Sequence, residues 1–241
     1  MALVSTRGMI FRTLKYSENS IICDVFTESH GLRSFIVSSS KNNRAMTNLM
    51  QVMNLVDIVF YEKNAEQIQR IKECHLHHFY QKISSDIIRS SIGTFMLELS
   101  RNTIREHEAQ PDLFEFLMQW FVGLDEREGG LQYYHLSFML ALTQWSGFYP
   151  HTNYVEGKQT FFDMLSGSFV PVVFDARHVL IEKESTLLYQ LLAQNESGEG
   201  IRGFKLAERN ALMDMLLKYY QLHIPGFKPL KSLDIIRQVI Q

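Results

Sequence analysis

The chain has 241 residues, 46% of them hydrophobic and 21% charged, which is enough apolar content for one large domain or two small ones. Its formal net charge of −2 gives the whole protein no electrostatic attraction for a polyanion. No apolar run approaches the ~20 residues of a membrane span and the N-terminus has no signal-peptide pattern, so we expect a cytoplasmic protein with no membrane partner.

The sequence contains two cysteines, Cys23 and Cys74, and each lies in a short apolar run of the kind that forms a strand. Two cysteines are too few for the disulfide framework of a small secreted domain. We therefore expect two buried free thiols, although the sequence by itself leaves a pairing between them open.

Residues 1–80 read as five strands, because short runs rich in Val, Ile and Phe alternate with turn residues. Gly31 supplies the positive φ that the second turn needs, and residues 38–48 are expected to form a polar loop. The fourth strand is apolar on both faces, as in a small closed barrel. Such a pattern predicts an OB-type β-barrel. The five expected strands are Val4–Phe11, Ser20–Thr27, Leu32–Val37, Gln51–Glu62 and Gln67–Leu76.

From Ser84 onward apolar residues recur at steps of three and four, which is the period of a helix buried on one face. Ser84 or Ser85 is the expected N-cap of the first helix, which should end near His107. The pattern after Phe148 is less regular, with a short strand or turn expected at Phe169–Phe174. Further helices are expected at residues 111–121, 131–145, 186–193, 206–222 and 233–240.

The change of period near residues 79–84 predicts a domain boundary, with domains at 1–80 and 81–241. The expected fold class is α+β: an N-terminal five-stranded OB-type β-barrel followed by a mostly α-helical domain. The aromatic residues of the helical part fall mostly at helical spacing, which favours core packing over a groove for a cofactor or peptide.

The segment from Cys74 to His78 first suggests a metal site, because His75 and His77 point the same way on a strand and imidazole is a common ligand. No fourth ligand is spaced nearby, and Cys74 lies on the opposite face. The ligand count favours partly exposed histidines at a strand end. We predict no metal and no other cofactor.

Pairs of acidic residues are the remaining candidates for chemistry, and they fall at helix ends and in a loop, where solvated surface is the common case. Phosphate-binding and dinucleotide-binding glycine patterns are missing, as are a Gly-x-Ser-x-Gly elbow and a His-Glu-x-x-His helix. The sequence predicts no enzyme. The acidic residues concerned are Glu106, Glu108, Asp125, Glu126 and Glu128.

Charge is spread unevenly: residues 1–80 contain nine Lys and Arg against seven Asp and Glu, and residues 81–241 contain fifteen against nineteen. The barrel is therefore the better candidate for binding nucleic acid. Single strands cross one face of an OB barrel, where cations pair with phosphates and aromatic residues such as Tyr16 or Phe11 stack on bases. Scattered surface charge is the open alternative, because the barrel is only weakly basic. The candidate cations are Arg7, Arg12, Lys15, Arg33, Lys41 and Arg44.

Six segments, in order along nearly the whole chain, resemble the RecO family. Each motif is weak, but their order and spacing are fairly specific. The first three correspond to the opening strands of the family's barrel, the fourth to its Gly-Phe-x-Pro segment and the last two to its C-terminal signature. They are Thr6–Arg12, Tyr16–Ser20, Phe26–Val37, Trp145–Pro150, Leu217–Tyr220 and Pro229–Leu233.

The resemblance implies a recombination mediator in gap repair that binds single- and double-stranded DNA. Such a protein works with RecR, engages single-strand-binding protein, helps to load RecA and anneals complementary strands. The resemblance also implies that the barrel cations contact phosphate, with Lys15 the weakest candidate, and that the helical domain supplies partner contacts. The alternative is a protein-interaction adaptor that reaches DNA only through its partners.

The sequence departs from the family pattern in two places. Many members bind zinc through paired cysteines just after the Gly-Phe-x-Pro segment, whereas this chain has no cysteine at residues 153–157. The loop after the third strand is often rich in Lys and Arg in the family but keeps only Lys41 and Arg44 here. We therefore expect no zinc site and a weaker, or partner-assisted, affinity for DNA.

Overall fold

The structure is a computed structural model that describes residues 2–39, 44–62, 64, 67–104, 108–173, 176–198 and 200–240. The chain divides into two compact units, Met1–Glu126 and Arg127–Gln241. The first unit holds a β-barrel and the helices that follow it, and the second is mainly helical. None of the described helices combines the length and the apolar character needed to cross a bilayer.

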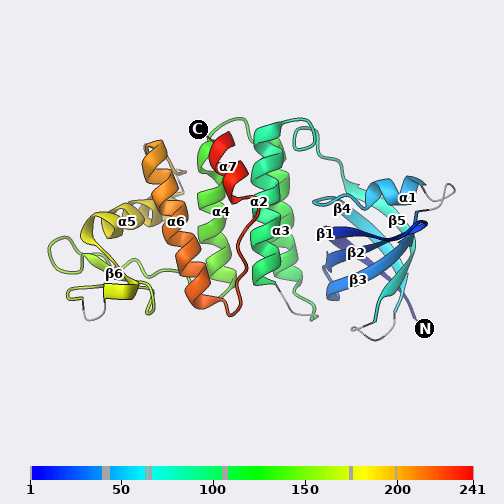
Figure 1. The fold of residues 1–241 in the computed structure, drawn as a ribbon, viewed down its shortest axis with the longest axis horizontal. Coiled ribbons are helices and arrows are strands. Elements are labelled where there is room, and N and C mark those ends of the chain that lie inside the picture. The colour runs from blue at the N-terminus through cyan, green and yellow to red at the C-terminus, as the bar shows by residue number, and fades with distance from the viewer. Residues whose placement is uncertain are drawn as a thin grey trace. The chain divides into compact units, whose positions relative to one another are not determined.

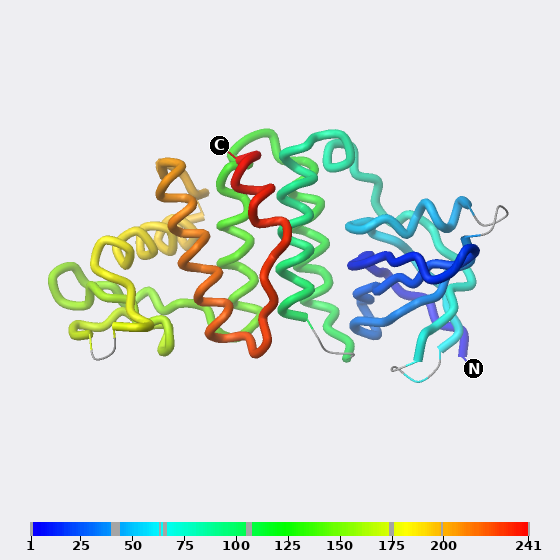
Figure 2. The backbone as a smooth tube through the Cα atoms, in the orientation of Figure 1, coloured from blue at the N-terminus to red at the C-terminus, as the bar shows by residue number. Residues whose placement is uncertain are grey.

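Five strands close into a barrel with the order β1-β2-β3-β5-β4, which confirms the expected barrel (Figures 1 and 2). Every pair is antiparallel except β3 with β5. The long strand β1 pairs with both β2 and β4, and register shifts at Ile10/Arg12 and Lys15/Ser17 bend it as closure requires. The strands are β1 (Leu3–Ser17), β2 (Ser20–Thr27), β3 (Gly31–Ser38), β4 (Leu55–Tyr61) and β5 (Gln69–His78).

The barrel interior is filled by side chains from all five strands, among them Phe35 and Phe60 in edge-to-face contact. Cys23 and Cys74 both lie in this core as free thiols, as expected. Burial raises the pKa of Cys74 to about 12 and raises that of Cys23 as well, so both thiols stay protonated. They serve the barrel as small apolar residues.

The stretch before the fourth strand differs from the prediction: a short helix, α1 (Arg44–Leu49), forms where a polar loop was expected, and β4 begins at Leu55 and not at Gln51. Met46 and Leu49 pack against the barrel core, and Met50, directly after the helix, belongs to that core. Six residues are too few to show a helical period in sequence, so the contact with the barrel decides their conformation.

The first long helix, α2 (Ile87–Thr103), begins later than expected, because its N-cap is Asp86 and not Ser84 or Ser85. The Asp86 carboxylate accepts hydrogen bonds from the backbone N–H groups of Ile88 and Arg89. The helix ends before the expected terminus at His107, which lies outside the described residues.

Helix α3 (Pro111–Glu126) contains Asp125 in its last turn, which we expected to be a solvated surface acid. That expectation was wrong: Asp125 is 4% exposed and its carboxylate accepts hydrogen bonds from the backbone N–H groups of Gln81, Lys82 and Ile83. Burial acts to raise the pKa of Asp125, but these three donors hold it below its ordinary value. The carboxylate thereby ties the segment after β5 to the end of α3.

The described residues of the second unit form four α-helices and a small sheet of order β7-β6-β8. The expected strand or turn at Phe169–Phe174 corresponds in part to β7, whereas β6 and β8 were not predicted. The elements are α4 (Leu131–Trp145), β6 (Phe161–Asp163), β7 (Ser168–Val170), the 3-10 turn η2 (Ala176–His178), β8 (Val179–Leu180), α5 (Glu182–Ser197), α6 (Leu206–His223) and α7 (Leu233–Val239).

The region after the Gly-Phe-x-Pro segment is held by polar and aromatic contacts. The Asn153 side-chain amide donates to the backbone carbonyl of Phe169 and accepts from its N–H, both at 2.9 Å. Tyr154 stacks on Tyr189 with ring centroids 4.3 Å apart. Within the described ranges, no three His, Cys, Asp or Glu residues are arranged to hold a metal ion.

Candidate nucleic-acid interface

The barrel wall formed by β1, β2, β3 and β5 carries two rows of outward side chains, because residues paired across strands share a face. Arg12 pairs with Asp24 and Asp24 with Ser34. In the next row Leu14 pairs with Ile22, Ile22 with Ile36, and Ile36 with Arg70 on the parallel strand β5. We call these seven residues the outer face: Arg12, Leu14, Ile22, Asp24, Ser34, Ile36 and Arg70.

The second row gives the outer face an aliphatic strip. Leu14 is 46% exposed, and Ile22 and Ile36 are half-buried beside it. Tyr16, further along β1, is 64% exposed. Nucleobases have apolar faces that favour such a surface once they are unstacked, whereas a duplex keeps its bases inside.

Two arginines flank this aliphatic strip. Arg70 is exposed at the β5 end, and the Arg12 side chain is 42% exposed on β1. The Arg12 Nε donates to the Asp24 Oδ2 at 2.6 Å, and the Ser34 Oγ donates to the other oxygen, Oδ1, at 2.8 Å. The strip therefore lies between two cations that can reach phosphate groups.

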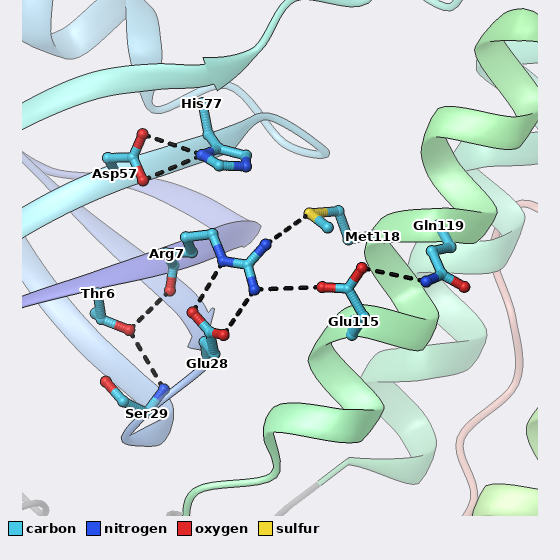
Figure 3. A network of polar contacts seen from close by, with 9 residues as sticks. All are labelled: Thr6, Arg7, Glu28, Ser29, Asp57, His77, Glu115, Met118 and Gln119. Carbon is cyan, nitrogen blue, oxygen red and sulfur yellow. Dashed lines mark hydrogen bonds and ion pairs between the residues drawn. The ribbon is translucent and has the colours of Figure 1, made fainter.

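Arg7 lies on the same strand but in a closed network (Figure 3). Its Nε and Nη2 donate to the two carboxylate oxygens of Glu28 at 2.9 and 2.6 Å, and Nη2 also donates to Glu115 of α3 at 3.2 Å. Its Nη1 approaches the Met118 sulfur at 3.5 Å, and the guanidinium covers the Phe114 ring. The Glu28 hydrogen bond raises the pKa of Arg7 and the same bond lowers the pKa of Glu28. This geometry favours a role in joining barrel and helix over phosphate contact.

The other candidate cations are dispersed. Lys15 is exposed but pairs with the core residue Ile21, so it belongs to the opposite side of the strand from Leu14. Arg33 pairs with Val25 of the core, and burial lowers its pKa while Glu62 opposes that change. Of the four candidates that lie on β1 and β3, only Arg12 is therefore brought onto the outer face.

The loop cations cannot be assigned to the outer face in the same way. Lys41 lies outside the described residues, and Arg44 is exposed at the first position of α1. Of the two aromatic candidates, Tyr16 is exposed, but Phe11 is 1% exposed and packs on Phe26 with ring centroids 5.5 Å apart. The prediction that Phe11 is available for stacking was wrong, because Phe11 is buried against Phe26, which in turn contacts Phe114 of α3.

Sequence reasoning missed Arg70. Its neighbours Gln69 and Ile71 are buried, so alternation along the strand could have marked it as outward. Its position beside Ile36 depends on the parallel pairing of β3 with β5, which no local pattern reveals. His77, considered above as a ligand, instead lies 3.1 Å from the Asp57 carboxylate.

A closed five-stranded barrel with an aliphatic wall flanked by cations, followed by helices, defines an OB-type protein of α+β class. The family described as "Recombination protein O N terminal" matches residues 1–80, and "Recombination protein O C terminal" matches residues 84–234. The chain belongs to the RecO family of DNA repair proteins, which confirms the resemblance.

Full-length relatives agree with this assignment. The DNA repair protein RecO of Flavobacterium psychrophilum is 31% identical over 98% of this chain and 98% of its own length. That of Phocaeicola vulgatus is 30% identical over 98% and 99%, and that of Porphyromonas gingivalis 27% identical over 97% and 98%. The similarity therefore covers both units.

Proposed function

We propose that this DNA repair protein is a recombination mediator that binds DNA through the outer face of its barrel. In gap repair it acts with RecR to displace single-strand-binding protein, loads RecA indirectly through that displacement, and anneals complementary strands. Membership of the RecO family supports the role, and the barrel supports the mode of binding. The helical unit supplies contacts with partners.

The observation that carries the proposal is the aliphatic strip of Leu14, Ile22 and Ile36 between Arg12 and Arg70. Arginine neutralises phosphate and releases counterions, while apolar side chains contact unstacked bases. Two neutralised strands can approach each other and pair. These steps need no covalent chemistry, so we assign no catalytic residue and no cofactor, and cytoplasmic DNA is the substrate we expect.

The second candidate is an adaptor that reaches DNA only through its partners. The small number of available cations favours it, since Arg7 is held by Glu28 and Arg33 lies at a partly buried position beside Glu62. In this case the aliphatic strip contacts a polypeptide instead of bases. The two candidates differ in whether the isolated chain binds DNA.

Fluorescence anisotropy with a labelled oligothymidine, titrated at several salt concentrations, distinguishes the two. We expect affinity to fall with salt, and the double variant Arg12→Ala, Arg70→Ala to bind about tenfold or more weakly with a smaller salt dependence. Lys158→Ala, an exposed position in the second unit, is the matched loss of a cation and should have little effect. No DNA binding by the isolated chain, together with retained binding of RecR, would select the adaptor.

The mediator role has its own test. Complementary strands coated with single-strand-binding protein should anneal faster with this protein than without it, and the double variant should lose that acceleration. Equal acceleration by the double variant would show that annealing does not depend on the outer face.

A further inference from the structure

Asp24 is an acidic residue in the middle of a surface proposed to attract phosphate. A carboxylate at this position repels a polyanion, so simple electrostatics predicts that its removal strengthens DNA binding. The Asp24 side chain is only 15% exposed, and both its oxygens already accept hydrogen bonds from Arg12 and Ser34. These contacts indicate that Asp24 acts on its neighbours in the barrel wall and does not serve as a solvated surface charge.

The geometry of Arg12 explains what this carboxylate does. Only the Nε of Arg12 donates to Asp24, and the part of the chain that the structure describes offers no hydrogen-bond acceptor to its two terminal nitrogens. Arg7 is the contrasting case, since its Nε and both terminal nitrogens contact Glu28, Glu115 and Met118. All three guanidinium nitrogens of Arg7 thus have partners, whereas Arg12 is held by its Nε and its two terminal nitrogens remain available to a ligand.

We infer that Asp24, held by Ser34, is a positioning residue that orients the Arg12 guanidinium to grip one phosphate of single-stranded DNA. The inference rests on the proposed DNA binding through the outer face. A guanidinium fixed at Nε has lost most of its rotamer freedom before the ligand arrives, so less entropy is lost when its two terminal nitrogens bind phosphate oxygens.

The neighbouring row suits this arrangement. Leu14 lies two residues beyond Arg12 on the same strand, and Ile22 has the same relation to Asp24 on β2. Residues two apart on a strand share a face, so the aliphatic strip begins directly beside the arginine. A nucleotide whose phosphate binds Arg12 can rest its base on Leu14 and Ile22.

The test is whether removal of the Asp24 carboxylate weakens or strengthens DNA binding. We expect Asp24→Ala to weaken binding of an oligothymidine about fivefold to tenfold, although it removes a negative charge, with Asp24→Asn between it and the parent. Glu18→Gln, which removes an exposed charge at the β1–β2 turn, is the control and should leave affinity unchanged or slightly higher. Circular dichroism and thermal unfolding show whether each variant is folded.

A second pair of variants separates positioning from a general loss of structure. On an Arg12→Ala background, Asp24→Ala should no longer weaken binding and should instead strengthen it, since only the repulsion remains. Ser34→Ala, which removes the donor to Asp24, should weaken binding about twofold to threefold in the presence of Arg12. Tighter binding by Asp24→Ala with Arg12 intact would overturn the inference and leave the proposed function standing.

A measurement on the free protein tests whether Asp24 holds Arg12 when no DNA is bound. In the free protein the Arg12 Nε–H should give a distinct, exchange-protected NMR signal that is lost in Asp24→Ala. An Arg12 signal unchanged in that variant would refute the positioning role whatever the DNA affinity. Absence of DNA binding by the parent chain would refute the proposed function, and the phosphate grip with it, even if the signal behaves as expected.

Discussion

The two ends of β1 carry similar side chains and have different surroundings. Toward Arg7 the outward face of the strand is covered by α3, where Phe26 lies between Phe11 and Phe114. Toward Leu14 the same face is open and aliphatic. The comparison teaches that a cation on a barrel strand is a candidate for contact with DNA only where no helix covers that strand. Whether the strand is covered depends on α3, whose Glu115 lies about a hundred residues further along the chain than Arg7.

The largest effect should come from the covered end. Phe26→Ala removes a fully buried ring in contact with two others, and we expect the first unit to lose about 3–5 kcal/mol of unfolding free energy. Ile22→Ala at the open end should cost clearly less, because its side chain is only half-buried. Urea unfolding measures both. Equal losses would mean that the open end is packed as tightly as the covered one.

Arg7→Ala should come next. It removes the charged hydrogen bonds to Glu28 and Glu115 and leaves the partly buried Glu28 without its main partner, at a cost of about 1.5–3 kcal/mol. The folded variant should bind oligothymidine nearly as well as the parent. A tenfold loss of DNA affinity in the folded variant would show instead that Arg7 contributes to DNA binding.

Tyr16→Ala tests the open end with an exposed ring. Since aromatic stacking on a base contributes about 1–3 kcal/mol, we expect affinity for single-stranded DNA to fall about fivefold or more. Thermal stability should change little, because the side chain is mostly exposed. Tyr16→Phe is the control that keeps the ring, and it should retain affinity if stacking is the reason for the loss.

The smallest effect should be a dependence of stability on pH that comes from the Arg7–Glu28 pair, at the end of β1 that α3 covers. The Arg7 hydrogen bond lowers the pKa of Glu28 from its ordinary 4.5, so the unfolded state binds more protons in acid. The stabilisation from this pair is complete above pH 4.5 and is lost as pH falls through the lower pKa of the folded state. Urea unfolding of the parent and of Glu28→Gln across this range measures it. If the unfolding free energies of the two proteins changed with pH in parallel, the Arg7–Glu28 pair would not cause the loss of stability in acid.

Alternation and turn chemistry were sufficient to predict the five strands, because a closed barrel of this size needs apolar residues on its inner face at every second position. Helical spacing likewise predicted α4 at its observed bounds, where a long apolar period ends at Gly147. The ordered motifs predicted the family. The strands and the helix are local features, so one stretch of sequence contains enough information to specify each of them, whereas the family depends on the order of motifs along the chain.

What the sequence by itself determined about this protein is therefore its fold class, a β-barrel followed by helices, and its family. Only the tertiary structure decided that α1 forms against the barrel, that Asp125 is buried, and that Phe11 is buried against Phe26. It also separated Arg7, which α3 engages, from Arg12, which Asp24 holds by one nitrogen. Each of these outcomes depends on atoms supplied by another element, and a local pattern contains no information about which element will be there.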